Sequence, residues 1–150
     1  MTNRRISASA IIAAPPRDVY GIIADYRESH PAILPRPPFE SLVVEEGGRG
    51  AGTVIRVSMR VLGRPQTFRA RVTEPEPGRV LVETNDTGYV TTFTVDAVEN
   101  GNRAAVTIST EAPRKGLVGA LESWFVGRLL RPAYQKELER LAAVADARAA

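Results

Sequence analysis

Histidine occurs once in the chain, at position 30, so any mechanism that needs an imidazole must use that residue. Asp25, Tyr26 and Glu28 lie close to it in the sequence and could share acid or base chemistry with it. A lone histidine directly before a proline, here Pro31, is typical of a partly exposed helix end. We expect that position for His30, with a catalytic role as the alternative.

Other kinds of catalytic centre have little support in the sequence. The chain has no cysteine, which excludes thiolate nucleophiles and disulfides, and it has no Gly-x-Ser-x-Gly nucleophile motif. No ligand-type residues recur at a spacing that would place them on one face with His30, so we expect no metal and no other cofactor. Residues 47–52 are rich in glycine, but the strand expected after them indicates a hairpin loop rather than a phosphate-binding loop.

Several hydroxyl side chains are expected toward one end of three neighbouring strands, namely Thr84, Tyr89, Thr91 and Thr110. A buried hydroxyl without a hydrogen bond costs about 1–3 kcal/mol. These groups therefore bond to one another, to backbone or to water, or they orient the polar end of a mainly apolar ligand. Arg128, within an apolar stretch, either extends to solvent or attracts an anion over a cavity. The candidate catalytic residues are accordingly His30, Tyr89 and Arg128.

The first 38 residues predict a strand and two short helices. The strand covers residues 6–13, and Pro15-Pro16 opens a helix that runs to about Asp25. A second helical segment, residues 27–34, is interrupted by Pro31 and ended by a cluster of prolines. From Phe39 the pattern alternates with a period of two, which predicts strands near 39–46, 53–62, 66–74, 79–85, 88–98 and 103–111.

An Asn-Gly pair at positions 100 and 101 is a strong hairpin signal. A turn there would pair Val95 with Val106, Phe93 with Ile108, and Thr91 with Thr110. Alternation along all the strands then predicts an inner face made of Thr53, Ile55, Val57, Met59, Val61, Phe68, Ala70, Val72, Val80, Val82, Thr84, Tyr89, Thr91, Phe93, Val95, Ala104, Val106, Ile108 and Thr110. A mixed-charge outer face that includes Arg56, Arg69 and Glu83 is expected to face solvent.

A long helix over residues 116–148 closes the chain, with a kink expected at Pro132. Its first half is apolar around much of its surface, and only the preceding sheet is wide enough to be covered by it. Ala70 and Ala104 are small side chains on an inner face of larger ones. We therefore expect a cavity between the sheet and this helix.

The order of these elements is that of the helix-grip fold. The text SASAIIAAPPRDVYGIIADYRESHPAILP, residues 7–35, resembles the opening of the polyketide cyclase/dehydrase and lipid transport branch of the START-like (SRPBCC, Bet v 1-like) superfamily. The closest matches are Pro-x-x-Val-Tyr at 16–20, Ala-Asp-Tyr at 24–26 and Gly-x-Gly-Thr at 50–53. The resemblance covers essentially the whole chain. It implies an α+β domain in which a seven-stranded antiparallel sheet wraps around the C-terminal helix, with a short split helix pair after the first strand and a ligand cavity inside.

The function expected from this fold is binding, as a carrier or sensor, of a small hydrophobic ligand such as a polyketide, lipid or isoprenoid. The alternatives are a polyketide aromatase/cyclase or dehydratase, and a co-chaperone-like protein-interaction module. Fold alone does not choose among them. The residues expected to bind the ligand are Ile55, Val57, Met59, Phe68, Ala70, Val82, Tyr89, Thr91, Phe93, Ala104, Val106, Ile108, Leu121, Trp124, Phe125 and Arg128.

Length, composition and charge limit the number of domains, the compartment and the kinds of partner. At 150 residues we expect one domain, residues 1–150, and the lack of cysteine fits the cytoplasm. The net charge of +3 comes from basic residues scattered among acidic ones, whereas a nucleic-acid binder concentrates them on one face. No apolar run approaches the roughly 18 residues of a membrane span. We expect a small-molecule partner, no nucleic acid and no membrane span, and the oligomeric state stays open.

Overall fold

The computed structural model describes the backbone of residues 5–113 and 117–149, and the side chains of residues 5–113 and 127–149. The elements follow one another in the predicted order. They are β1 (Arg5–Ile12), α1 (Pro16–Ala24), α2 (Ser29–Ile33), β2 (Phe39–Glu46), β3 (Val54–Val61), β4 (Arg64–Glu76), β5 (Val80–Asn85), β6 (Val90–Val98), a short 3-10 turn (Glu99–Gly101), β7 (Arg103–Glu111) and α3 (Leu117–Ala149).

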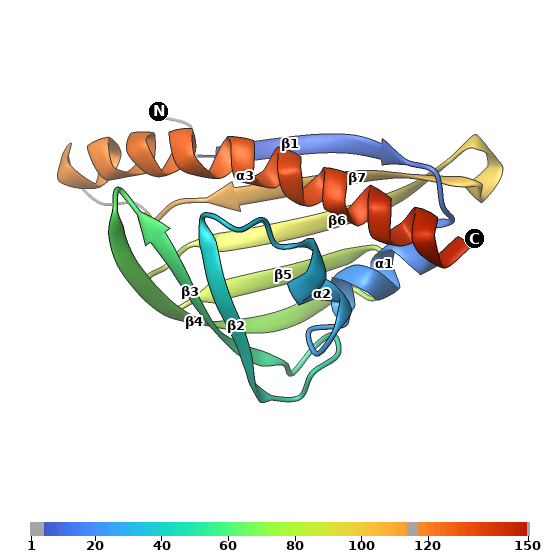
Figure 1. Cartoon of the computed structure of the whole chain (residues 1–150), viewed down its shortest axis with the longest axis horizontal. Coiled ribbons are helices and arrows are strands. Elements are labelled where there is room, and N and C mark those ends of the chain that lie inside the picture. Colours follow the sequence, from blue (N-terminus) through green and yellow to red (C-terminus); the bar gives the residue numbers. More distant parts are fainter. Residues whose placement is uncertain (1–4, 114–116, 150) are drawn as a thin grey trace.

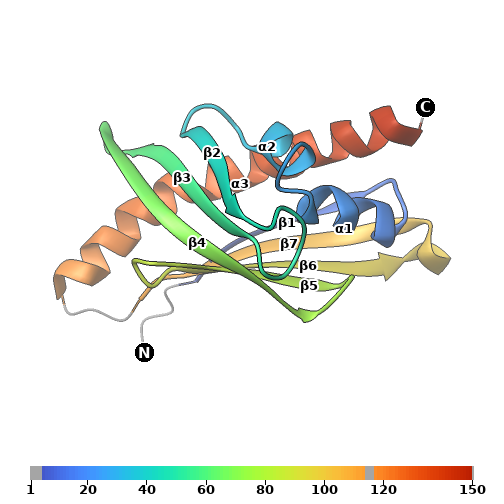
Figure 2. The same cartoon turned by 90° about the horizontal axis from the view of Figure 1, so that it is seen from below.

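The strands form one antiparallel sheet in the order β1-β7-β6-β5-β4-β3-β2. The sheet curves around α3, which crosses its concave side, and α1 and α2 lie beside the C-terminal part of that helix (Figure 1). From below, β2, β3 and β4 turn away from the plane of the other strands (Figure 2). The helices therefore cover the two ends of the concave side unequally. No helix in the described part of the chain is long and apolar enough to cross a membrane.

The split between α1 and α2 follows from hydrogen bonds to Asp25 and not from the prolines of the two helices. Pro16 occupies the first turn of α1, where a backbone N–H has no helical partner. Partial burial opposes ionisation of Asp25, but hydrogen bonds from Ser29 and from the backbone after Asp25 lower its pKa overall. Ser29 donates both its N–H (3.2 Å) and its Oγ (2.8 Å) to Oδ2 of Asp25, so α2 begins at Ser29 rather than at residue 27. Pro31 lies in the first turn of α2 and does not interrupt it.

The predicted register of β6 and β7 is confirmed. Val95 pairs with Val106, Phe93 with Ile108, and Thr91 with Thr110. The connection is longer than a two-residue turn, because the last pair joins Val98 to Arg103. Glu99 and Asn100 adopt positive φ angles of 51° and 58° inside this loop, a conformation that asparagine tolerates better than most residues.

The predicted face of β5 is wrong. Val80, Val82 and Thr84 were expected inside, yet Leu81 is fully buried and Glu83 and Asn85 line the interior. Both alternating sets of β5 contain apolar residues, so alternation did not distinguish the faces, and a carboxylate was expected in water. The pairing of β4 with β5 also shifts between Thr73 and Glu76, an irregularity that sequence alternation does not show. Because β5 turns this face inward, the carboxylate of Glu83 lies on the inner face of the sheet.

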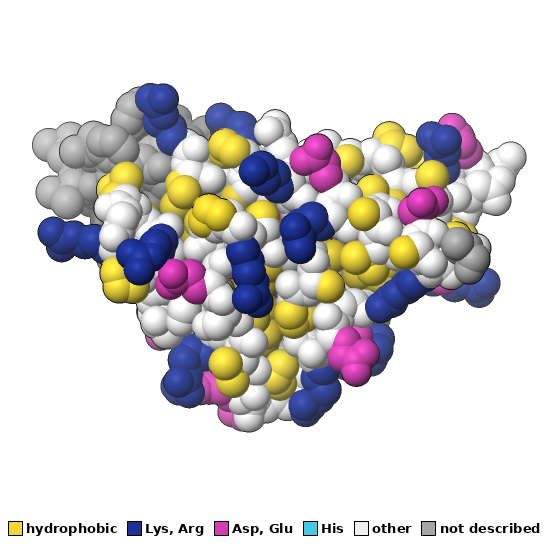
Figure 3. Space-filling model, in the orientation of Figure 1, with side chains coloured by type: hydrophobic (Ala, Val, Ile, Leu, Met, Phe, Trp, Pro, Cys, Tyr) yellow, Lys and Arg dark blue, Asp and Glu magenta, His cyan; other side chains and the backbone are white. Residues whose placement is uncertain are grey.

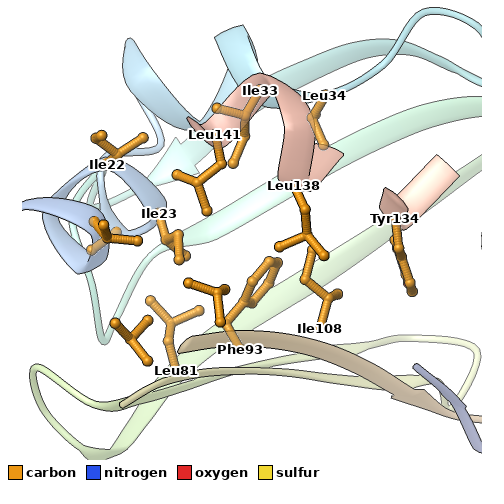
Figure 4. Packing of buried hydrophobic residues seen from close by; sticks show 14 of the residues in the cluster. Ile22, Ile23, Ile33, Leu34, Leu81, Phe93, Ile108, Tyr134, Leu138 and Leu141 are labelled. Carbon is orange, nitrogen blue, oxygen red and sulfur yellow. The ribbon is translucent and has the colours of Figure 1, made fainter. Parts of the chain in front are cut away.

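Buried apolar side chains from α1, α2, β5, β6, β7 and α3 pack together at one end of the concave side. Figure 4 shows Ile23, Leu81, Phe93, Ile108 and Leu141 converging there. At this end the sheet and the helices are in direct contact. The helix α3 passes through Pro132 as one continuous element, and the kink expected there stays a prediction.

Candidate functional site

A cavity of about 300 Å³ lies between the inner face of the sheet and α3. Because a water molecule in the liquid occupies about 30 Å³, this volume accommodates roughly ten groups of that size. Hydrophobic side chains gather between α2, α3 and β2 on the face that Figure 3 shows, among several lysines and arginines. Most of the lining is apolar, from Leu34, Phe39, Leu42, Ile55, Val57, Met59, Val61, Phe68, Ala70, Phe93, Leu129 and Leu130.

Two of the predicted hydroxyls are joined to each other and to the closing helix. Thr91 Oγ1 lies 2.7 Å from Thr110 Oγ1, which in turn lies 2.5 Å from the hydroxyl of Tyr134 in α3. Burial raises the pKa of Tyr134, although the Thr110 hydrogen bond opposes this. The two threonines thus satisfy their hydroxyls within the protein, while Tyr89 lines the cavity and Thr84 is exposed.

His30 is not a partly exposed helix-end residue, because only 2% of it is exposed. Its Nδ1 lies 2.7 Å from the carbonyl oxygen of Ile23, which can only accept, so Nδ1 carries a proton and donates. The ring stacks on Tyr26 with centroids 4.4 Å apart and meets the edge of Phe93 at 5.6 Å. The prediction failed because Pro31 is accommodated in the first turn, which lets α2 continue and turn His30 inward.

Two glutamates share the same lining with His30. Glu83 Oε2 accepts a 2.5 Å hydrogen bond from the hydroxyl of Tyr26 and lies 3.8 Å from Nε2 of His30. Glu137 of α3 is 2% exposed, and its Oε2 has no hydrogen-bond partner among the described residues. Burial, and then the proximity of Glu83, raises the pKa of Glu137 well above its ordinary value. Burial and Glu83 likewise raise the pKa of Tyr26.

The glycine-rich loop between β2 and β3 is hydrogen-bonded to the chain at the C-terminal end of α1, just before His30. Gly48 accepts a hydrogen bond from the N–H of Tyr26 (2.9 Å), and Gly50 donates to the carbonyl of Ala24 (3.0 Å). A Cβ on Gly48 would lie 2.3 Å from Nε of Arg27, so no larger residue fits without displacing that side chain. The hairpin-loop interpretation of residues 47–52 is confirmed, and the loop helps to position Tyr26 and His30.

The structure places the predicted ligand-binding residues in four groups. Eight line the cavity, namely Ile55, Val57, Met59, Phe68, Ala70, Tyr89, Thr91 and Phe93. Ala104, Val106 and Ile108 do face inward but are buried in the packed end, where α1 contacts β7. Val82 lies on the opposite face of β5, and Arg128 is exposed and not part of the lining. The side chains of Leu121, Trp124 and Phe125 lie outside the described residues.

Sequence reasoning missed Glu83, Glu137 and Tyr134 as lining residues. A signal for Glu137 was present, since it lies three residues after Tyr134 and four before Leu141, within the stripe that a helix turns toward its core. An acidic residue in such a stripe is either buried in the core or part of a functional site. Glu83 had no such signal, because its strand alternates ambiguously.

Comparisons with known proteins agree with this architecture. The KanY protein, solved in solution by NMR, is 26% identical with a TM-score of 0.83 and covers 97% of this chain and 99% of its own. The Zhui aromatase/cyclase from Streptomyces sp. R1128 is 17% identical with a TM-score of 0.74, covering 99% and 97%. A START superfamily protein from Mycobacterium smegmatis is 15% identical with a TM-score of 0.68, covering 95% and 97%. No curated protein matches the chain.

The fold is thus the helix-grip fold, as the sequence resemblance implied, and these solved structures share it. The sequence model of the family described as polyketide cyclase / dehydrase and lipid transport matches residues 3–146. The chain belongs to that family.

Proposed function

We propose that this protein binds one small, mainly apolar molecule in the cavity between the sheet and α3, as a carrier or sensor. The observation that carries the proposal is the cavity itself, about 300 Å³ with a mostly apolar lining and a polar group at one side. Sites for small molecules have this composition, because apolar contacts supply affinity and a few polar groups set orientation. A polyketide, a lipid or an isoprenoid fits this description, and the family to which the chain belongs includes lipid transport in its description.

The test measures how tightly a neutral apolar probe binds, first to the unaltered protein and then to a variant whose cavity is partly filled by a larger side chain. Nonanol, with ten non-hydrogen atoms, matches the volume and carries no charge, and its binding is measured by titration calorimetry. Ala70 lines the cavity, so Ala70→Leu should weaken nonanol binding at least tenfold. Thr73→Leu adds the same side chain to the exposed face of the same strand and should leave binding within threefold. No binding to the unaltered protein, or equal loss in both variants, would contradict the proposal.

An enzyme of the polyketide cyclase or dehydratase type is the second candidate, and one observation favours it. His30 and Glu83 place a ring nitrogen and a carboxylate 3.8 Å apart at the cavity lining, where they could transfer protons to or from a bound molecule. Native mass spectrometry of freshly purified protein would identify a co-purifying molecule. If the protein converts that molecule to a product, and His30→Gln stops the conversion while binding persists, the protein is an enzyme rather than a carrier or sensor.

A protein-interaction module has no comparable support. The large apolar side chains that are clearly exposed among the described residues are Ile11, Val43 and Leu62. They come from β1, from β2 and from the turn after β3, which are separate segments. Isolated exposed apolar residues are normal on protein surfaces.

A further inference from the structure

The charged groups of the cavity lining are unusual for a protein expected to hold a fatty or polyketide chain. Glu83 and Glu137 contribute two carboxyl groups, and His30 is the one basic side chain among the described lining residues. The neighbouring basic residues of α3, Arg131, Lys136 and Arg140, are exposed and do not line the cavity. Attraction or repulsion inside the cavity is therefore decided by the two carboxyl groups, since exposed charges are screened by solvent and salt.

Glu137 supplies the observation that points to a ligand. It is 2% exposed, it lines the cavity, and its Oε2 lacks a hydrogen-bond partner among the described residues. Leaving a buried polar atom unpaired is unfavourable, so a group that persists in this state gains from a partner that arrives with a ligand. The partner must donate a hydrogen bond when the carboxyl group is ionised.

Three kinds of ligand end can be compared at this position. A carboxylate or phosphate would meet the negative charge of Glu83, and a like charge at short range is unfavourable in a poorly solvated site. A hydroxyl could form one hydrogen bond with Glu137 but would bring no charge to compensate that of Glu83. An ammonium group offers three donors and a compensating charge. Phe93 and Tyr89 also line the cavity, and aromatic rings attract a cation that lies over their faces.

We infer that the Glu83–Glu137 end of the cavity receives an amine, so that the bound molecule is an apolar amine rather than a fatty acid or another anion. This inference rests on the proposed function, because it names the polar end of the molecule that the cavity holds. The ammonium pairs with Glu83 and Glu137, and its apolar part lies among the side chains of β3, β4 and α3.

Pairing with an ammonium changes the protonation of Glu137. The titratable groups that share its surroundings are Glu83 of β5, Tyr26 after α1, His30 of α2 and Tyr134 of α3. In the empty cavity, burial and the proximity of Glu83 favour the protonated carboxyl. A bound cation favours the carboxylate, so binding of an amine releases a proton, whereas binding of an alcohol does not.

The experiment compares nonylamine, nonanol and nonanoate by titration calorimetry at pH 7.5. These probes differ only in the polar end. We expect nonylamine to bind at least tenfold more tightly than nonanol and nonanoate to bind most weakly. Titration in two buffers of different ionisation enthalpy should show proton release with nonylamine alone.

Matched variants separate the cavity carboxylates from the general surface charge. Glu137→Gln and Glu83→Gln each keep the side-chain shape, and each should lower the amine-to-alcohol affinity ratio at least tenfold. Glu139→Gln removes the same charge from an exposed position of α3 and should leave that ratio within twofold. Urea unfolding of each variant verifies that it folds, and two independent glutamates are tested so that one unfolded variant does not decide the result.

Four outcomes overturn the inference. Nonanoate that binds as tightly as nonylamine, or nonylamine that binds no more tightly than nonanol, removes the amine preference while the proposed function stands. An amine preference that survives in both cavity variants assigns it to the surface. If none of the three probes binds, the proposed function fails together with the inference.

Discussion

At one end of the interior, the inner-face residues of β5, β6 and β7 meet α1, α2 and the second half of α3, and Leu81, Ile108 and Leu141 are at most 1% exposed (Figure 4). At the other end, β3 and β4 present residues of similar size, such as Val57 and Met59, to a cavity. Both sets are buried and apolar. The difference lies in coverage, because the short helices fill only one end of a strongly curved sheet. Burial alone therefore does not identify a site in this fold.

The largest expected effect comes from truncating one large side chain at each end. Leu141→Ala removes packed atoms and leaves a new void, which should lower the free energy of unfolding by about 2–5 kcal/mol. Met59→Ala removes atoms that already face empty space on one side, so its loss should be clearly smaller. Urea unfolding measures both. Equal losses would mean that the two ends are packed alike.

An intermediate effect is expected when the two inner-face alanines are enlarged. Ala104 is fully buried in the packed end, so Ala104→Leu should overpack it and lower the free energy of unfolding by about 1–3 kcal/mol. Ala70 faces the cavity, so Ala70→Leu should leave stability nearly unchanged. The sequence alone placed both alanines at the cavity, whereas the structure assigns them opposite outcomes. Comparable destabilisation by both, in urea titrations under the same conditions, would contradict the cavity at Ala70.

We expect the smallest change in the free energy of unfolding for Glu137→Gln at acidic pH. The dependence of that change on pH tests whether Glu137 is buried as the cavity lining requires. Burial raises the pKa of Glu137 above its ordinary value of 4.5, so the folded protein holds this proton more tightly than the unfolded chain does. The resulting stabilisation is complete below pH 4.5 and is lost as the pH rises through the folded value. Relative to Glu137→Gln, the unaltered protein should therefore lose stability between pH 5 and pH 8.

Urea unfolding of both proteins at the two pH values isolates the contribution of this carboxyl group. A difference between the proteins that is the same at pH 5 and pH 8 would show that Glu137 titrates alike in the folded and unfolded states. Glu137 would then not have the buried surroundings that the cavity lining gives it.

Much of the fold was predictable because it depends on local patterns. Alternation with a period of two marked β3, β4, β6 and β7 and their inner faces, and the Asn100-Gly101 signal set the register of the last hairpin correctly. The alternation of β5 was ambiguous, since Leu81 and Val82 are both apolar. The order of elements and the motifs at 16–20, 24–26 and 50–53 were sufficient for the family.

The candidate site was decided by tertiary structure. Eight of the expected ligand-binding residues line the cavity, but Ala104, Val106 and Ile108 share their pattern and are packed. The sequence specifies which side of a strand is apolar. Whether that side meets another side chain or a void depends on the curvature of the sheet and the positions of α1 and α2. The same geometry turns His30 inward and brings Glu83 and Glu137, which lie 54 residues apart, to one lining, where burial and proximity give them properties that neither has in its own segment.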